Sequence, residues 1–291
     1  MNEGKPHWLD RSLFPFTSRF VNIGANRVHY IDEGAGPTLL LLHGNPTWSF
    51  LYRHIVHLLS PHFRCIALDY PGFGLSTAAT GYGYTPREHS DVLEGFVYAL
   101  GLSDLRIMVQ DWGGPIGLGF AGRHPDRVHS LIIGNSFAWP ATTGMKGFSY
   151  VMGNPVARYF ITHRNMLARW LIPAGTNRTL TEAELAAYMG PFPTPASRLP
   201  TWIFARQIRA SASYLAEVEA GLARLSDKPA LIVWADADGA FGPADRDRFV
   251  RVFRKHQLID LPGAKHFIQE NAPEAIASAI LNWRLDPSER L

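Results

Sequence analysis

The segment VQDWGGP, residues 109–115, has the pattern of a strand-to-helix turn that presents a catalytic residue. Its third residue is Asp111, and the two glycines that follow Trp112 allow a sharp turn into a helix. A carboxyl group with an ordinary pKa of about 4 is charged at neutral pH and needs no base to activate it. Asp111 is therefore suited to attack a saturated carbon that carries a leaving group, forming an ester on the protein. The alternative is an aspartate that only caps the helix.

His266 lies in the segment GAKHFIQENAP, between a predicted strand and a predicted helix. Because Asp111 needs no deprotonation, we expect His266 to activate the water that hydrolyses the ester. A loop histidine bonded only to backbone groups is the alternative. Asp236 and Asp238 both follow the strand ALIVW and could orient the imidazole ring. We favour Asp238, since it lies farther past the strand, where the loop can reach across, although either could be an ordinary turn aspartate.

A leaving anion needs hydrogen-bond donors, and two residues could supply them. Asn45, in the loop HGNPTWS, carries an amide, and Trp112 carries an indole N–H. Both are neutral donors that can hold a large anion. The backbone N–H groups of the same two residues could also form an oxyanion hole for hydrolysis of the ester. For Trp112, packing against neighbouring side chains is the alternative.

The hydrophobic pattern predicts the elements that position these residues. Runs rich in β-formers come first, and residues 38–44 are almost wholly apolar, as expected of a strand covered on both faces. The elements predicted next are a helix at 49–59, a strand at 63–69, a helix from Pro86 to Gly101 capped by Thr85 and Glu88, a strand at 105–110, a helix at 113–124 and a strand at 128–135. This alternation predicts an α/β sheet with helices on both faces.

Residues 136–222 contain no convincing strand, but they contain short helical stretches and many aromatic residues. The alternation then returns with a strand at 229–238, a helix at 243–254, a strand at 256–262 and a last helix that Asn271 and Glu274 are expected to cap. We therefore expect a core of residues 1–135 and 223–291 with an inserted helical cap, residues 136–222. Asn45, Asp111, Asp238 and His266 then each follow the carboxyl end of a strand, where the reactive groups of open α/β sheets collect.

Composition narrows the classes of protein. The 291 residues carry a formal charge of +3 with no block of like charge, so no nucleic-acid partner is expected. The single cysteine, Cys65, excludes an internal disulfide framework and reads as a buried thiol. The N-terminal residues lack the apolar core of a signal peptide, and no apolar run approaches the roughly 20 residues that span a bilayer. We expect a soluble, cytoplasmic protein without a membrane partner.

Four segments, HGNPTWSFLYR, DYPGFGLS, VQDWGGPIGL and KHFIQENAPE, resemble the haloalkane dehalogenases of the α/β-hydrolase superfamily, over about residues 15 to 285. The resemblance implies an α/β-hydrolase fold, with a mostly parallel eight-stranded sheet flanked by helices and an inserted cap. It implies hydrolysis of a carbon–halogen bond to an alcohol, a halide ion and a proton, with water and without a cofactor or metal. Asp111 would be the nucleophile, His266 the base, and Asn45 with Trp112 the halide-binding pair.

Members of this family differ in the third residue of the triad. Some have a glutamate after the strand that follows the nucleophile helix, but here that strand ends in Asn135. Others have an aspartate after the later strand, which matches Asp238. An Asp-His-Asp triad with an Asn-Trp pair resembles the third subgroup, some members of which oligomerise, so a homo-oligomer is included among the expected partners.

Several other functions fit parts of this pattern. An epoxide hydrolase shares the aspartate nucleophile and needs two cap tyrosines. The tyrosines in or beside the cap are Tyr150, Tyr159, Tyr188 and Tyr214. A haloacid dehalogenase needs cations for the substrate carboxylate, and Arg164 and Arg169 lie in the cap. A luciferase-like monooxygenase and a non-catalytic protein that binds small molecules are further alternatives. Asn45 with Trp112 favours the dehalogenase.

Overall fold

The computed structural model describes residues 6–284. Its sheet has eight strands in the order β1-β2-β4-β3-β5-β6-β7-β8. The strands are β1 (Arg19–Ile23), β2 (Asn26–Glu33), β3 (Thr38–Leu42), β4 (Arg64–Leu68), β5 (Leu105–Asp111), β6 (Val128–Ser136), β7 (Ala230–Ala235) and β8 (His256–Leu261). The pairs β1–β2 and β2–β4 are antiparallel, and every other pair is parallel. The predicted fold, a mostly parallel eight-stranded sheet of the α/β-hydrolase type, is confirmed.

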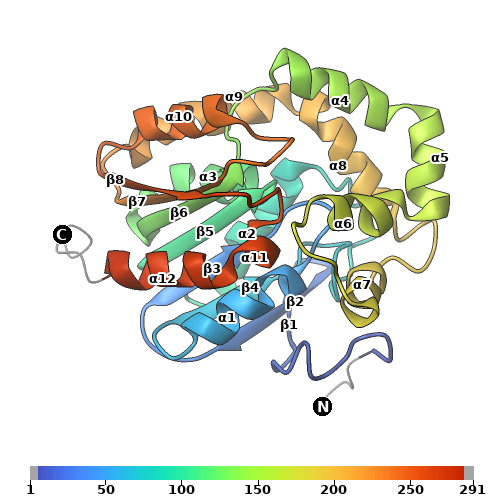
Figure 1. Cartoon of the computed structure of the whole chain (residues 1–291), viewed down its shortest axis with the longest axis horizontal. Helices are drawn as coiled ribbons and strands as arrows, with labels where there is room; N and C mark the ends of the chain where they lie inside the picture. The colour runs from blue at the N-terminus through green and yellow to red at the C-terminus, as the bar shows by residue number, and fades with distance from the viewer. Residues whose placement is uncertain (1–5, 285–291) are drawn as a thin grey trace.

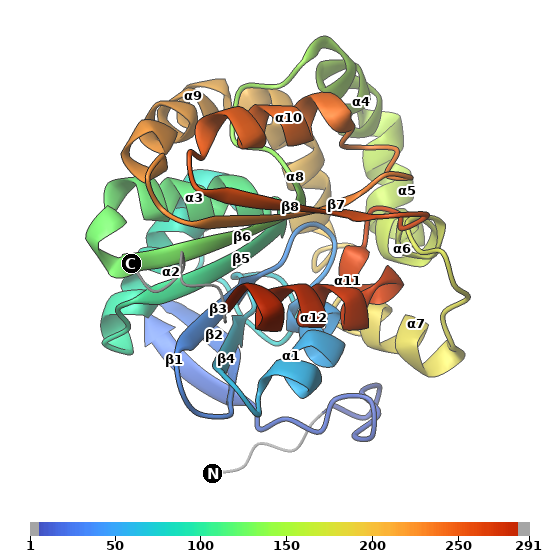
Figure 2. The same cartoon turned by 60° about the vertical axis from the view of Figure 1, so that its left-hand side comes forward.

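Helices cover both faces of this sheet. The helices of the core are α1 (Arg53–Leu59), α2 (Pro86–Ala99), α3 (Gly113–Arg123), α10 (Pro243–Val252), α11 (Ile268–Asn271) and α12 (Pro273–Arg284), with the short turns η1 (Ser49–Tyr52), η2 (Pro125–Arg127) and η4 (Leu222–Leu225). Helices α1 and α12 pack together on one face, whereas α2, α3 and α10 cover the other (Figures 1 and 2). No helix in residues 6–284 is both long and apolar enough to cross a bilayer.

Between β6 and β7 the chain is helical. These helices are α4 (Thr143–Gly153), α5 (Pro155–Arg164), the π-helical turn η3 (Leu167–Leu171), α6 (Ile172–Ala174), α7 (Glu182–Met189), α8 (Leu199–Ala210) and α9 (Ala212–Gly221). Helices α4 to α8 extend to one side of the sheet, beyond the carboxyl ends of the parallel strands (Figure 1). Helix α9 returns to the core and packs against α3. The α4–α8 segment therefore covers the end of the sheet where the predicted site residues lie.

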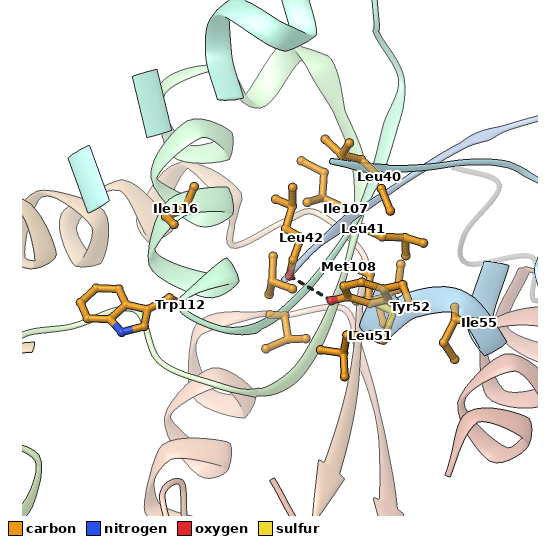
Figure 3. Close-up of a cluster of buried hydrophobic side chains, with 14 of the residues drawn as sticks. Leu40, Leu41, Leu42, Leu51, Tyr52, Ile55, Ile107, Met108, Trp112 and Ile116 are labelled. Atoms are coloured by element: carbon orange, nitrogen blue, oxygen red, sulfur yellow. Dashed lines mark hydrogen bonds between the residues drawn. The ribbon is translucent and has the colours of Figure 1, made fainter. Parts of the chain in front are cut away.

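Buried apolar residues at the centre of the sheet support the loops that follow β3 and β5. Leu41 and Leu42 are fully buried, and so are Ile107 and Met108 of β5 (Figure 3). Burial of one such side chain contributes about 1.5–3 kcal/mol to stability. The hydroxyl of Tyr52 donates to the carbonyl of Leu42 at 2.9 Å, which ties η1 to the end of β3 (Figure 3).

Most of the predicted local signals are present, but one is wrong. Thr85 and Glu88 form a capping box at the start of α2. Asn271, by contrast, is the last residue of α11, and α12 begins at Pro273, so Asn271 and Glu274 do not cap the last helix. The Asn271 carboxamide instead accepts from the Asn177 N–H at 2.6 Å and thus holds a cap loop.

Candidate active site

Asp111 lies at the tip of the turn between β5 and α3, in the left-handed region of backbone conformation with φ +50°. Such a conformation costs a residue other than glycine about 1–3 kcal/mol, and it is typical of functional sites. The surrounding packing holds the turn: the Ser136 hydroxyl donates to the Asp111 carbonyl at 2.7 Å. A Cβ on Gly44 would lie 2.2 Å from Asp111 Oδ1, and one on Gly113 would lie 2.2 Å from the Leu42 carbonyl. Glycine at these two positions is what lets the loops approach so closely.

The Asp111 carboxylate is surrounded by backbone donors. The Asn45 N–H donates to Oδ1 at 2.7 Å, and the Trp112 N–H also bonds to this carboxylate. Burial raises the pKa of Asp111 above its ordinary value of 3.8, although His266 and the two N–H groups act in the opposite direction. These are the two N–H groups predicted to form an oxyanion hole, and they reach the carboxylate itself.

The structure places His266 between two carboxylates. Its Nδ1 lies 3.1 Å from Asp238 Oδ2, and its Nε2 lies 3.8 Å from Asp111 Oδ2. Burial alone would lower the pKa of His266, but the charge and hydrogen bond of Asp238, together with the charge of Asp111, raise it above 6.5. The same pairing holds the pKa of Asp238 below 3.8, against the effect of burial. The ring is thus oriented by Asp238, with its other nitrogen directed toward Asp111.

The two aspartates that follow β7 have different surroundings. Asp238 accepts the Ala240 N–H at 2.7 Å in addition to its contact with His266. Asp236 is exposed, and its carboxylate accepts the Gly263 N–H at 2.7 Å. The structure therefore brings Asp238 to the histidine and directs Asp236 into a neighbouring turn.

Two further residues contact this group of side chains, and the sequence analysis assigned them no role. The Asn135 amide donates to Asp238 Oδ2 at 2.9 Å, and its carbonyl oxygen accepts the Ala235 N–H at 2.7 Å. The Gln110 amide donates to the His266 carbonyl at 3.1 Å and lies 3.3 Å from His266 Nε2. The signal in the sequence was a polar residue directly after a run of apolar residues near the carboxyl end of a strand, in both β5 and β6. Such a residue is buried and must find a partner there.

A cavity of about 560 Å³ opens above Asp111, and Asn45, Trp112 and His266 also line it. One N–H of the Asn45 amide donates to the Thr201 carbonyl of α8 at 3.1 Å, which leaves the second for a ligand. The Trp112 ring packs edge-on against Phe137 with a centroid distance of 5.0 Å. The predicted nucleophile, base and anion donors thus face one space.

Most of the remaining wall is apolar. The apolar residues that line it are Phe137, Met145, Phe148, Leu167, Leu171, Ala174, Ala205, Ile208, Ala240, Phe241 and Phe267. No tyrosine, lysine or arginine is among the lining residues that the structure describes. Tyr188 and Tyr214 bond instead to Glu270 and to the Pro115 carbonyl. The cavity therefore suits a small apolar substrate, with polar groups concentrated at Asp111.

A second group of buried charges lies between the core and the cap. Within residues 6–284, His54, Glu184 and Glu270 are close enough together to ligate a metal ion. However, Arg53 bonds to both glutamates, and Arg178 does so as well. Two cations already neutralise the two carboxylates, so this group fits an ion-pair cluster better than a metal site.

Comparison with known proteins identifies the family. A family model described as the alpha/beta hydrolase fold matches residues 37–273. Haloalkane dehalogenase 2 of Mycobacterium tuberculosis is 46% identical over 275 residues, which cover 94% of this chain and 96% of that protein. The chain belongs to the haloalkane dehalogenases. The crystal structure of haloalkane dehalogenase DbeA from Bradyrhizobium elkani, at 27% identity, matches 92% of this chain and 97% of its own with a TM-score of 0.85.

The haloalkane dehalogenase family shares its fold with enzymes of other activities. A cis-3-alkyl-4-alkyloxetan-2-one decarboxylase of Shewanella oneidensis is 30% identical over 94% of this chain and 89% of its own length. The identity to the haloalkane dehalogenase of Mycobacterium tuberculosis is considerably higher over the same share of the chain.

Proposed function

We propose that this enzyme hydrolyses haloalkanes to an alcohol, a halide ion and a proton. In the first step a carboxylate oxygen of Asp111 attacks the carbon that bears the halogen. The new carbon–oxygen bond forms as the carbon–halogen bond breaks, and the electron pair of that bond leaves with the halide. The Asn45 amide and the Trp112 indole N–H stabilise the departing anion. The observation that carries this proposal is the single cavity in which Asp111 faces both these donors and His266.

In the second step water hydrolyses the ester. His266 Nε2 accepts a proton from water, and the resulting hydroxide attacks the carbonyl carbon of the ester. The N–H groups of Asn45 and Trp112 stabilise the oxyanion, and the alcohol then leaves as the Asp111 carboxylate reforms. Asp238 stabilises the protonated imidazole, which afterwards releases its proton to solvent. No cofactor or metal takes part in either step.

The finer assignments belong to the same proposal. Asp111, His266 and Asp238 form the catalytic triad, with Asn45 and Trp112 as the halide-binding pair, as in the third subgroup. Residues 1–135 and 223–291 form the hydrolase core, and residues 136–222 form the inserted cap, whose last helix, α9, packs back against the core. The partners are a small halogenated substrate, water and halide, with no nucleic acid, and the enzyme is cytoplasmic. A homo-oligomer remains among the expected assemblies.

The cavity wall supports dehalogenation over the two nearest alternatives. An epoxide hydrolase needs tyrosines that protonate the epoxide oxygen, and no described lining residue is a tyrosine. A haloacid dehalogenase needs a cation for the substrate carboxylate, but Arg164 and Arg169 line a different cavity.

The test is a comparison of substrates. We expect the enzyme to release bromide from 1-bromobutane and 1,2-dibromoethane, measured by titration of the free halide, and to leave styrene oxide unchanged. Turnover of styrene oxide without release of bromide from either haloalkane would contradict the proposal and favour an epoxide hydrolase.

A further inference from the structure

The outer face of the cap is unusually apolar. Nine large hydrophobic residues are exposed in residues 6–284, and eight of them lie between 148 and 171, with exposed fractions of 36–67%. They are Phe148, Tyr150, Val151, Val156, Tyr159, Phe160, Trp170 and Leu171, on α4, α5 and η3. Both α4 and α5 pack on α8 and lie at the periphery of the molecule (Figures 1 and 2). We call these eight residues the cap patch.

Helix α5 shows how unusual this surface is. Val156, Tyr159 and Phe160 follow the i, i+3, i+4 spacing that normally marks the buried stripe of a helix, yet all three are exposed. Only Ile161 and Thr162 of this helix are buried. An apolar stripe that faces outward is typical of a surface that another partner covers.

The charges around the cap patch indicate the chemistry of that partner. Residues 127–181 contain no aspartate or glutamate. Exposed cations within or beside the patch include Lys146, Arg158, Arg164 and Arg169, and none of these four pairs with a carboxylate that the structure describes. Elsewhere on the surface, arginines do form such pairs, for example Arg123 with Glu94 and Arg254 with Asp227. The cap patch is therefore both apolar and uncompensated in positive charge.

A hollow beside the patch has the same character. Its volume is about 640 Å³, and Arg164, Arg169 and His163 line it. Arg198 lines it too, but its guanidinium donates to the backbone carbonyls of Phe192, Thr162 and Pro193. No described lining residue is acidic. Guanidinium groups bind phosphate oxygens with paired, charge-assisted hydrogen bonds. A phosphate headgroup would thus find cations next to aromatic side chains that can enter the acyl region.

We propose that the cap patch docks on a lipid bilayer with anionic headgroups. Exposed aromatic and aliphatic side chains enter the interface, and the surrounding arginines attract anionic lipid. A second copy of this chain is a poorer occupant, because a symmetric dimer through this face would bring the same unpaired cations together. The sequence led us to expect no membrane partner because no segment can span a bilayer, but docking at the interface needs no such segment.

Docking would also orient the catalytic cavity. Phe148 and Leu171 are exposed members of the cap patch, and both line the cavity above Asp111. The cavity therefore reaches the surface within the patch, where apolar molecules dissolved in the bilayer could enter it. The docking surface does not depend on the activity proposed above, and its test requires no turnover.

The experiment measures co-sedimentation of the full chain with vesicles of phosphatidylcholine alone or mixed with phosphatidylglycerol. We expect binding to the anionic vesicles that weakens at high salt. Tyr159→Ser with Phe160→Ser should lower the partition coefficient at least about tenfold, because two rings leave the interface. Arg164→Gln with Arg169→Gln should lower it about fivefold per charge.

Matched controls lie outside the patch. Tyr98→Ser removes the ninth exposed hydrophobic residue. Arg251→Gln with Arg254→Gln removes two exposed charges from the surface of the hydrolase core, outside the cap. Both should bind like the wild type, and every variant should keep wild-type halide release from a water-soluble substrate. Absence of binding to anionic vesicles at low salt would overturn the proposal. So would equal losses in patch and control variants, or a dimer that Tyr159→Ser with Phe160→Ser converts to a monomer while vesicle binding is absent.

Discussion

Two groups of charged residues in this enzyme differ in how far their charges compensate one another. The arginine cluster joins Arg53 and Arg178 to Glu184 and Glu270, so two cations face two carboxylates. In the candidate active site, two carboxylates share one histidine, and the group lies beside a cavity. In the first group the charges compensate one another, whereas the second holds Asp111, the proposed nucleophile, whose charge is only partly compensated.

The pKa shifts follow from this difference. Burial raises the pKa of Glu184, but hydrogen bonds and charges from the arginines outweigh it and lower the pKa to about 2. For Asp111 the neighbours do not outweigh burial, and the pKa is raised. Compensated buried charge stabilises a junction between elements, here α1, α7 and α11, whereas uncompensated buried charge is available for chemistry. Substitutions in the two groups should therefore separate activity from stability.

The largest effect is expected at Asp111, the proposed nucleophile. Asp111→Asn should lower kcat by at least about 10⁴-fold, because a neutral amide cannot displace halide. The free energy of unfolding should stay the same or rise slightly, since burial disfavours the charge of Asp111. Asp236→Asn is the matched control and should retain activity, as Asp236 bonds to the turn at Gly263, whereas His266 bonds to Asp238. Equal loss of bromide release in both variants would contradict the assignment.

Glu270→Gln should lower the stability and leave kcat nearly unchanged, the reverse of Asp111→Asn. It leaves the buried Arg53 and the half-buried Arg178 without one of their carboxylates, which should cost about 3–5 kcal/mol in the free energy of unfolding. The change can be measured by urea denaturation, and kcat of the folded fraction should remain near that of the wild type. Glu274→Gln, on an exposed position of α12, is the control and should change stability by less than about 0.5 kcal/mol. A stable but inactive Glu270→Gln protein would place Glu270 in the catalytic machinery instead.

A smaller effect is expected at Asn135, which bonds to Asp238. Asn135→Ala removes a hydrogen bond of 2.9 Å to the Asp238 carboxylate. A bond to a charged group contributes about 1.5 kcal/mol, which corresponds to roughly a tenfold lower kcat. KM should hardly change, because Asn135 does not line the cavity. A steady-state comparison in which KM rises while kcat is unaffected would show that Asn135 acts on substrate binding.

The smallest effect is a shift of the pH profile. His266 must be neutral to accept a proton from water. Burial lowers its pKa, but Asp238 outweighs burial, so the pKa is raised above 6.5. The rate of ester hydrolysis should therefore be full at high pH and fall on acidification, as His266 takes up a proton. Asp238→Asn should move the midpoint of this fall to lower pH while also lowering the rate. If the midpoint moves up in Asp238→Asn, the electrostatic role of Asp238 is wrong.

The sequence predicted the parts of the site that depend on local pattern. The turn at Asp111 and the histidine after β8 each follow a strand, and the parallel sheet brings such strand ends together. The choice between Asp236 and Asp238 depends on where a loop directs two similar side chains, which pattern alone does not define. The prediction that Asn271 caps the last helix was wrong for a related reason. Asn271 is the last residue of the short helix α11, and its side chain bonds to Asn177, which is distant in the sequence.

The cap shows a further limit. The apolar spacing of α5 was readable in the sequence, but spacing does not say whether a stripe faces a core or solvent. Only the arrangement of α4, α5 and α8 shows that this stripe is uncovered. The sequence likewise showed that Gln110 and Asn135 are polar, but only the structure shows that they bond to His266 and Asp238.

The most direct test of the proposed mechanism is to stop the reaction after its first step. His266→Phe should still form the ester with 1,2-dibromoethane or 1-bromobutane but fail to hydrolyse it. Mass spectrometry should then show the peptide that contains Asp111 heavier by the alkyl group, with about one halide released per enzyme. His256→Phe, at an exposed histidine of β8, should turn over without accumulating an adduct. If His266→Phe releases no halide and carries no adduct on that peptide, Asp111 is not the nucleophile in the way we propose.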